Sequence, residues 1–325
     1  MKILVVFSGG TIGSAVKNGV ISPDKSNSYK LIEMYGRDSE IQFTAVQPFN
    51  ILSENMNGKL LAQLYSCINS YDLSQFDGVI VAHGTDTLQY TSAYLSYSFG
   101  LCSTPIVLVS AAYPLDDERS NGFSNFCGAV ELIRHGEGRG VFVSYKNSSS
   151  DFPLLHRASR ILPHLPYDDS VFSMYKNSVY ALYSDGDGLL INKHYAEQND
   201  SIVLSDCFEL EEKSDVMLLK AYVGAVLPEI PHGTKAVLLE GYHSGTLNTD
   251  GSELQRFCHK AQNADIPVYL TGACDGFNYE SKQFYDRLKI NVLPQASPIA
   301  MYMKLWMLKK DRLSDVFLPC GGDFK

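Results

Sequence analysis

Short runs of branched aliphatic residues recur along the chain, and each ends in glycine or small polar residues. The runs do not alternate with polar residues, as a half-exposed strand would, so they predict strands that are buried on both faces of a parallel sheet. The predicted strands are Ile3–Phe7, Gly78–Ala82, Ile106–Ser110, Val141–Tyr145, Ala236–Leu239 and Val268–Thr271.

Amphipathic segments lie between several of these strands. Lys59–Ser70 and Asn121–His135 each gather their apolar residues on one helical face, and Asp86–Phe99 follows the second strand as a further helix. Because strand and helix signals alternate, we predict an α/β fold with a doubly wound sheet.

A change in composition divides the chain. Residues 192–214 are rich in charge and contain no glycine, and a new strand–helix series begins after Val216. At roughly 150 residues per domain, a length of 325 residues suggests two domains. We predict a larger N-terminal domain over residues 1–191, a linker over 192–214 and a smaller C-terminal domain over 215–325.

The composition narrows the functional classes. The 27 Lys and Arg residues against 36 Asp and Glu residues give a net charge of −9, which disfavours nucleic-acid binding. The seven cysteines form no CxxC pair and are odd in number, as expected for reduced thiols in the cytoplasm. The first apolar run is too short for a signal peptide, and no run approaches the ~18–20 apolar residues of a membrane span. We therefore expect a cytoplasmic protein that does not bind membranes.

No metal or organic cofactor is expected. The histidines form no HExxH motif, and no Cys/His cluster has the spacing of metal ligands.

Two strand ends carry polar clusters, and ligands of open parallel sheets bind at the carboxyl ends of the strands. In the first cluster, Gly9 and Gly10 let backbone N–H groups approach an anion or an oxyanion, and Thr11 offers a hydroxyl that could act as a nucleophile. A simple strand-to-helix turn capped by Thr11 explains the same residues equally well. A nucleotide loop is disfavoured because neither GxGxxG nor GxxxxGK[ST] occurs.

The second cluster is His83-Gly84-Thr85-Asp86-Thr87. Asp86 could bind a substrate ammonium group while Thr85 orients a water molecule or moves a proton. Alternatively, Asp86 caps the helix that follows. His83 is expected to be structural, because no catalytic partner is visible beside it.

Together the two clusters resemble the two signatures of the bacterial-type L-asparaginases, and of the cytoplasmic type I form in particular. The segments are Gly9-Gly10-Thr11-Ile12 and His83-Gly84-Thr85-Asp86-Thr87-Leu88. The resemblance continues in Leu52–Met56, in Pro114–Gly122 with Asn125, and in Tyr242–Gly245.

This resemblance implies a larger α/β domain, a smaller flavodoxin-like domain and hydrolysis of L-asparagine, or of L-glutamine, without a cofactor. Thr11 would be the nucleophile, and Thr85 and Asp86 would assist catalysis. The residues implied in substrate binding are Ser53, Glu54, Gly10, Gly84 and Asp86. The resemblance also implies a homodimer or homotetramer, with Tyr242–Thr246 and Cys274–Gly276 near the contact between subunits.

Two positions depart from the family pattern. The family has a lysine that pairs with the second threonine and the aspartate, and this chain aligns Pro163, or with a shifted gap Arg157, at that place. The family tyrosine in the loop after the first signature is replaced by Val20, and Tyr29 lies close enough in sequence to substitute for it.

A different base would have to take the place of the lysine. A depressed-pKa amine accepts a proton, whereas a guanidinium stays charged and proline has no such group. Lys146 and His164 are the remaining candidates for a base, although the sequence favours a surface position for both.

Two alternatives stay open. The archaeal tRNA-dependent amidotransferase subunit shares this fold, but the acidic charge and a first strand that starts at Ile3, which leaves no room for a preceding domain, disfavour it. The altered lysine and tyrosine positions also fit a catalytically impaired protein that binds or senses an amino acid.

Overall fold

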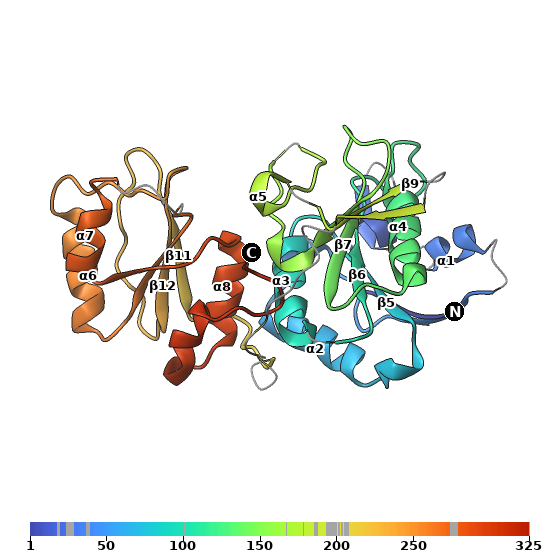
Figure 1. Cartoon of the computed structure of the whole chain (residues 1–325), viewed down its shortest axis with the longest axis horizontal. Helices are drawn as coiled ribbons and strands as arrows, with labels where there is room; N and C mark the ends of the chain where they lie inside the picture. Colours follow the sequence, from blue (N-terminus) through green and yellow to red (C-terminus); the bar gives the residue numbers. More distant parts are fainter. Residues whose placement is uncertain are drawn as a thin grey trace.

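The computed structural model describes the chain except for residues 18–19, 24–28, 37–39, 101, 167, 178, 185–187, 193–199, 201, 203, 205–207, 274–278 and 325. Figure 1 shows two lobes, each built on a sheet, with the amino terminus in the larger lobe and α8 lying between the two.

The larger lobe contains an eight-stranded sheet in the order β10-β9-β8-β7-β6-β5-β1-β4. Strands β4, β1, β5, β6 and β7 pair in parallel, whereas β8, β9 and β10 continue the sheet antiparallel. Its strands are β1 Lys2–Phe7, β4 Gln42–Val46, β5 Gly78–Ala82, β6 Ile106–Val109, β7 Val141–Tyr145, β8 Leu154–Arg157, β9 Ala181–Ser184 and β10 Gly188–Ile191. A separate hairpin pairs β2 Ser14–Lys17 with β3 Val20–Pro23.

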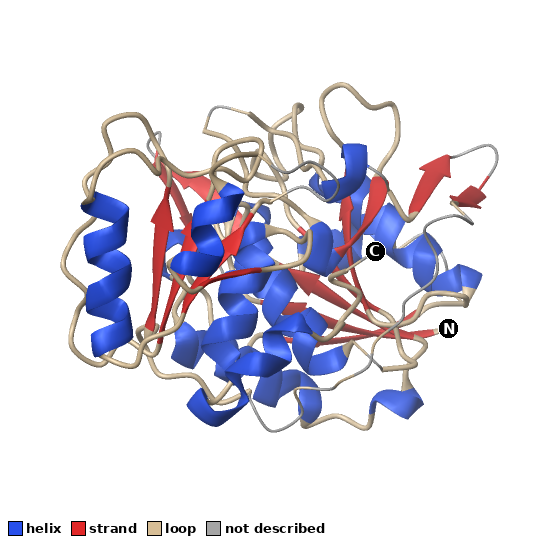
Figure 2. Ribbon diagram, turned by 60° about the vertical axis from the view of Figure 1, so that its left-hand side comes forward, coloured by secondary structure: helices blue, strands red, loops and turns tan. Residues whose placement is uncertain are grey.

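Helices cover both faces of this sheet, which is the doubly wound arrangement that the sequence predicts (Figure 2). Leu4 and Val6 of β1 face the core shared with α2 and α3, and Ile3 and Val5 face the core shared with α1 and α4. The helices of this lobe are α1 Lys30–Tyr35, α2 Gly58–Asn69, α3 Leu88–Phe99, α4 Gly122–His135 and α5 Met174–Asn177.

The smaller lobe contains a four-stranded parallel sheet in the order β11-β12-β13-β14. Its elements are β11 Val216–Lys220, β12 Ala236–Glu240, α6 Glu253–Asn263, β13 Val268–Thr271, α7 Lys282–Arg287, β14 Ile290–Val292 and α8 Pro298–Met307. Short 3₁₀ helices occur at Thr11–Gly13, Ser53–Asn55, Leu73–Gln75, Ala158–Arg160 and Lys310–Phe317.

Helix α8 joins the lobes. It packs on α3 of the larger lobe and on β11 and β12 of the smaller one, and one apolar core therefore runs through both lobes. The Tyr97 hydroxyl on α3 donates to the Ala300 carbonyl on α8 at 3.1 Å. This continuous core holds the carboxyl edge of the larger sheet in a defined relation to the rest of the chain.

The predicted strands and helices are confirmed to within a few residues, because fully buried aliphatic runs and amphipathic faces are strong signals. The helix expected from Asp86 begins at Leu88, with Thr87 as its N-cap. The boundaries at 191 and 215 stay a prediction, although β10 ends at Ile191 and β11 begins at Val216.

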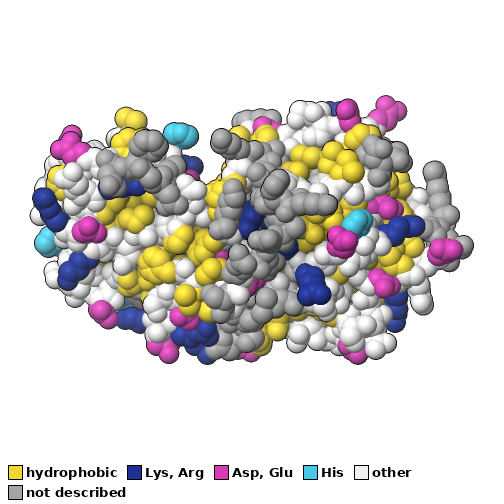
Figure 3. Space-filling model, viewed as in Figure 1, with side chains coloured by type: hydrophobic (Ala, Val, Ile, Leu, Met, Phe, Trp, Pro, Cys, Tyr) yellow, Lys and Arg dark blue, Asp and Glu magenta, His cyan; other side chains and the backbone are white. Residues whose placement is uncertain are grey.

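Lys and Arg side chains are interspersed with Asp and Glu over the face drawn in Figure 3. No helix in the described part of the chain is both long and apolar enough to cross a membrane.

Candidate active site

Three loops meet at the carboxyl edge of the larger sheet, because β4, β1 and β5 are neighbours and run in parallel. The Ser8 backbone N–H and side-chain hydroxyl both donate to the Ala82 carbonyl, at 3.0 and 2.9 Å. The Gly10 N–H donates to the Ile51 carbonyl at 2.8 Å. These bonds join the first signature loop to the second and to the segment that leads to Ser53.

Glycines allow the loops to approach this closely. A Cβ atom on Gly10 would lie 2.3 Å from the Gly84 Cα, and one on Gly84 would lie 2.5 Å from the Ser53 Cβ. Gly10 also has a φ of +80°, which side chains disfavour. The predicted residues Gly10, Gly84 and Ser53 are therefore packed together.

Asp86 points to Ser53 and does not cap α3. The Ser53 hydroxyl donates to the Asp86 Oδ2 atom at 3.3 Å, and the Thr87 hydroxyl donates to the Ser53 carbonyl at 2.9 Å. The Asp86 side chain is exposed while Ser53 is buried. An anchored but solvent-open carboxylate can receive a cationic ligand group.

His83 is structural, as expected. It is fully buried, its Nδ1 lies 2.7 Å from the Gly84 carbonyl oxygen, and its Nε2 lies 2.9 Å from the Thr91 hydroxyl. Because a carbonyl only accepts, Nδ1 carries the hydrogen and Nε2 accepts from Thr91. Burial lowers the pKa of His83 to about 4, so the ring is neutral at pH 7 and braces the second signature.

A cavity of about 660 Å³ opens beside the second signature. It lies between the ends of β5, β6 and β7 and a loop over residues 162–166 and 168–170 that we call the cavity loop. Its lining residues are Thr85, Asp86, Ala112, Tyr113, Tyr145, Ser148, His164, Leu165, Pro166, Asp168 and Asp169. Thr85 and Asp86 thus share one cavity with a histidine, two tyrosines and two further carboxylates.

Two asparagines hold the ends of β6 and β7 together at this cavity. Asn121 accepts from the Ala112 N–H at 3.0 Å and donates to the Lys146 carbonyl at 2.8 Å. Asn125 donates to the Ser110 carbonyl and accepts from the Lys146 N–H, at 2.8 and 2.6 Å. The family-like segment Pro114–Gly122 with Asn125 therefore serves to shape one wall of the site.

The segment that leads into the cavity loop is pinned at both ends. Arg160 is buried, and its Nε and NH2 groups donate to the carbonyls of Gly322 and Phe324, at 2.6 and 2.5 Å. The Leu162 N–H then donates to the Phe172 carbonyl at 2.8 Å. The chain's last residues and the return of the loop together fix where residues 163 and 164 point.

The residues considered as replacements for the family lysine differ in their position relative to the cavity. Pro163 is exposed. Arg157 is buried away from the cavity, with its guanidinium over the rings of Phe142 and Tyr180. His164 lines the cavity and is half-buried, with its Nε2 atom buried. Lys146 is half-buried and is not among the cavity-lining residues.

The remaining predicted residues lie nearby but outside the cavity. Thr11 begins a 3₁₀ helix directly after Gly10 and is half-buried, and Glu54 is exposed next to Ser53. Neither lines the cavity. Tyr29 packs edge-on against Phe7 with its ring centroid 5.5 Å away, and nothing is described of the Val20 side chain.

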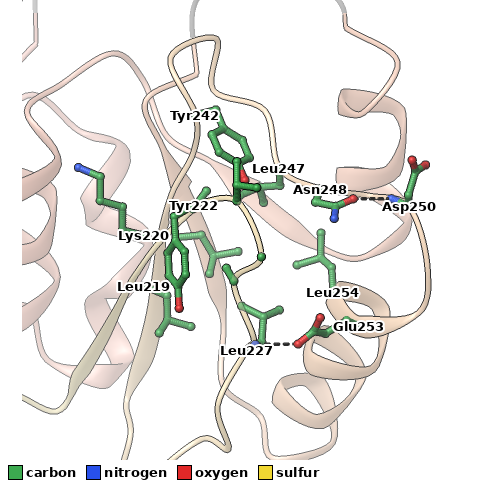
Figure 4. Close-up of a pocket in the computed structure, with 15 residues that line it drawn as sticks. Leu219, Lys220, Tyr222, Leu227, Tyr242, Leu247, Asn248, Asp250, Glu253 and Leu254 are labelled. Carbon is green, nitrogen blue, oxygen red and sulfur yellow. Dashed lines mark hydrogen bonds between the residues drawn. The ribbon is translucent and has the colours of Figure 1, made fainter.

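A smaller cavity of about 250 Å³ lies in the second lobe, between the loops that follow β11 and β12 (Figure 4). It includes Tyr242, and its Glu253 carboxylate accepts from the Leu227 N–H at 2.8 Å. Tyr242 belongs to the segment implied in subunit contact, whereas Cys274–Gly276 lies outside the described residues.

In the described part of the chain, no three His, Cys, Asp or Glu side chains are grouped so as to hold a metal ion. Five described cysteines form no disulfide, namely Cys67, Cys102, Cys127, Cys258 and Cys320.

Known proteins are similar to most of this chain. A family model described as "Asparaginase, N-terminal" matches residues 2–164. The chain is 28% identical over 284 residues to a protein of Metallosphaera sedula that is named as one of the subunits of glutamyl-tRNA(Gln) amidotransferase, and 27% identical over 305 residues to the protein of the same name from Pyrococcus furiosus. These matches cover 84% and 89% of this chain, but only 63% and 64% of the two relatives.

Solved structures share the whole fold. The L-asparaginase of Thermococcus kodakarensis matches with a TM-score of 0.79 at 21% identity, over 100% of this chain and 99% of that one. L-asparaginase I of Vibrio cholerae matches with a TM-score of 0.78 at 17% identity and the same coverage. At these identities the likeness concerns the fold.

Proposed function

This chain belongs to the asparaginase family, and we propose that it hydrolyses the side-chain amide of L-asparagine to L-aspartate and ammonia. The observation that carries the proposal is the contact between Ser53 and Asp86 at 3.3 Å, made where both glycine-rich signatures converge. The contact supports the proposal because it orients the exposed Asp86 carboxylate, which follows Thr85 in the chain, where the loop that leads to Thr11 packs against the second signature.

The proposed binding mode follows from charge. An amino-acid substrate carries an ammonium group, for which Asp86 is a fitting partner, and a carboxylate, which needs hydroxyl or N–H donors. Ser53, already oriented by Asp86 and Thr87, would supply one donor to the carboxylate end, and Glu54 would lie at that end too. The close-packed backbones of Gly10 and Gly84 would border the substrate.

The proposed reaction uses Thr11 as the nucleophile. Its hydroxyl oxygen would attack the amide carbon, the C–N bond would break, and ammonia would leave with the hydroxyl proton. Water would then hydrolyse the acyl-enzyme and return a proton to Thr11, with Thr85 relaying protons. Backbone N–H groups of the first signature would stabilise the oxyanion, and one such donor is worth ~2.7–4 kcal/mol in other enzymes.

We extend the proposal to L-glutamine as a second substrate, to assembly as a homodimer or homotetramer, and to a cytoplasmic location. The described cysteines, which form no disulfide, support a reducing compartment. The assembly rests on the family resemblance of Tyr242–Thr246, which borders the cavity of the smaller lobe through Tyr242.

Two other functions have specific support. The names of the relatives suggest an amidase component of an amidotransferase, in which released ammonia would serve a partner. The proline in place of the family lysine supports a protein that binds an amino acid without hydrolysing it.

Two assays on the isolated chain separate these functions. We expect ammonia release from L-asparagine together with a thermal shift by L-aspartate. A thermal shift without ammonia release would favour the binding protein. Ammonia release that requires an added partner would favour the amidotransferase component. The absence of both ammonia release and a thermal shift would overturn the proposal.

A further inference from the structure

We propose that His164 accepts the proton that Thr85 relays, in the place where the family has a lysine. This inference rests on the proposed function and deepens it, because it assigns the base that the sequence leaves missing.

The first argument is location. His164 and Thr85 line the same cavity, together with Asp86. The imidazole Nε2 atom is buried and has no hydrogen-bond partner among the described residues. A buried polar atom without a partner is costly in a folded protein, and this one lies beside a cavity where a proton donor can be bound.

The second argument is that the ring is held in place. The backbone before it is fixed by the bonds of Arg160 to the chain's last residues and of Leu162 to Phe172. The ring packs edge-on against Tyr145, with centroids 5.7 Å apart and planes at 72°. A group that transfers protons needs a defined position, and both contacts supply one.

The third argument is the protonation state. Burial lowers the pKa of His164, and the nearby carboxylates of Asp168, Asp86 and Asp169 oppose that shift. The other ionisable groups that line the cavity are the phenols of Tyr113 and Tyr145, and burial raises the pKa of Tyr145 to about 12, so that phenol stays protonated. The imidazole is therefore neutral at pH 7 and can accept a proton.

The proposed step balances without any added reactant. As water attacks the acyl carbon, its proton passes to the Thr85 oxygen while the Thr85 hydroxyl proton passes to the imidazole. When the bond between the acyl carbon and the Thr11 oxygen breaks, the imidazolium returns one proton through Thr85 to Thr11. The net reaction consumes one water molecule and leaves His164 neutral again.

The carboxylates have a second role in this scheme. Asp86, Asp168 and Asp169 line the same cavity as the ring, which becomes an imidazolium during the step, and their negative charge stabilises that cation. Pro163 is exposed and has no basic group, and the Arg157 guanidinium stacks on two rings away from the cavity. Neither residue can therefore accept the proton from Thr85.

The test compares kcat/KM for L-asparagine from about pH 5 to 9 in the wild type, His164→Gln, His164→Lys and the matched control His135→Gln. His135 is the last residue of α4, on the surface and near Glu137. Thermal unfolding of each variant checks that it is folded.

We expect His164→Gln to lower kcat by roughly 100-fold or more, because a positioned base contributes about 10²–10⁴. The acid limb of the wild-type profile should disappear in His164→Gln and move to higher pH in His164→Lys, because an amine must first lose its proton. His135→Gln should match the wild type.

Three results would overturn the proposal in distinguishable ways. If the wild type releases ammonia and His164→Gln keeps its rate and its pH profile, His164 is not the base although the proposed function stands. If the wild type releases no ammonia, the proposed function fails and this assignment fails with it. A folded His164→Gln that loses rate but keeps the acid limb also contradicts the assignment, since a packing role predicts that pattern.

Discussion

The Ser53 hydroxyl lies 3.3 Å from the Asp86 Oδ2 atom, and this contact joins the loop after β4 to the loop after β5. It exists because Gly84 has no side chain, since a Cβ there would lie 2.5 Å from both the Cβ and the Oγ atoms of Ser53. A carboxylate and a hydroxyl are thereby presented side by side, which suits the two charged ends of an amino acid.

Replacing Asp86 by Asn should weaken the binding of L-aspartate about 10- to 150-fold, because a hydrogen bond to a charged group is worth ~1.5–3 kcal/mol. Ser53→Ala should have a smaller effect, near ~0.5–1.5 kcal/mol. Isothermal titration calorimetry measures both, with Glu229→Gln on the exposed surface as the control. Unchanged affinity in Asp86→Asn would remove Asp86 from the binding site.

Replacing Gly84 by Ala should disturb both the fold and the site. The new Cβ would lie 2.5 Å from the Ser53 Cβ and 3.1 Å from the Gly10 Cα, so the two loops must separate. We expect a loss of ~1–3 kcal/mol in the free energy of unfolding and weaker aspartate binding. Gly138→Ala is the matched control, because its Cβ would meet the nearest atom at 3.4 Å. Equal stability of the two variants would argue against this packing.

The sequence predicts the centre of the fold better than its margins. Fully buried runs such as Val79–Val81 carry an unambiguous signal, and they form the middle of the larger sheet. Gln42–Val46 forms the edge strand β4 and is only half-buried, so its composition gives no clear pattern. The strands β8, β9 and β10, which extend the sheet in antiparallel orientation, are likewise not among the strands that the aliphatic runs predict.

The candidate site likewise has a part that the sequence predicts and a part that it does not. The two signatures and Ser53 are local motifs, and they converge as the order of the strands requires. The place of His164 depends on bonds across the chain, from Arg160 to residues 322 and 324 and from Leu162 to Phe172. Its position next to Pro163, which aligns with the family lysine, was the only local signal.

Breaking the ion pair between Lys304 and Asp323 should lower the stability of the fold more than breaking an ion pair on the surface. Its atoms lie 2.6 Å apart and both side chains are fully buried. Lys304→Met leaves a buried carboxylate without its cation and should cost ~3–5 kcal/mol in the free energy of unfolding by urea. The exposed pair of Lys260 and Glu229 supplies the control, and Lys260→Met should cost at most ~1 kcal/mol. Similar losses in both variants would contradict the assigned burial.

Stability should fall in acid through His83. Its pKa in the folded protein is about 4 against 6.5 as the ordinary value, so between these values the unfolded chain binds a proton that the folded chain does not. The free energy of unfolding should therefore decrease as the pH falls through this window, by about 3 kcal/mol in all for this residue. The free energy of unfolding can be measured by urea titration at several pH values. In His83→Gln its dependence on pH should be weaker, by an amount that corresponds to the uptake of close to one proton on unfolding. An unchanged slope would mean that His83 is accessible to protons in the folded state.

The central claim is that Thr11 carries the acyl group during amide hydrolysis. The most direct measurement is the initial rate of ammonia release from L-asparagine by the wild type, Thr11→Ala and Thr11→Ser, with thermal unfolding as a check on each. We predict that Thr11→Ala loses at least about 1,000-fold in rate while remaining folded, and that Thr11→Ser keeps part of the activity because it retains a hydroxyl. Ammonia release by Thr11→Ala at a rate near that of the wild type would contradict the account.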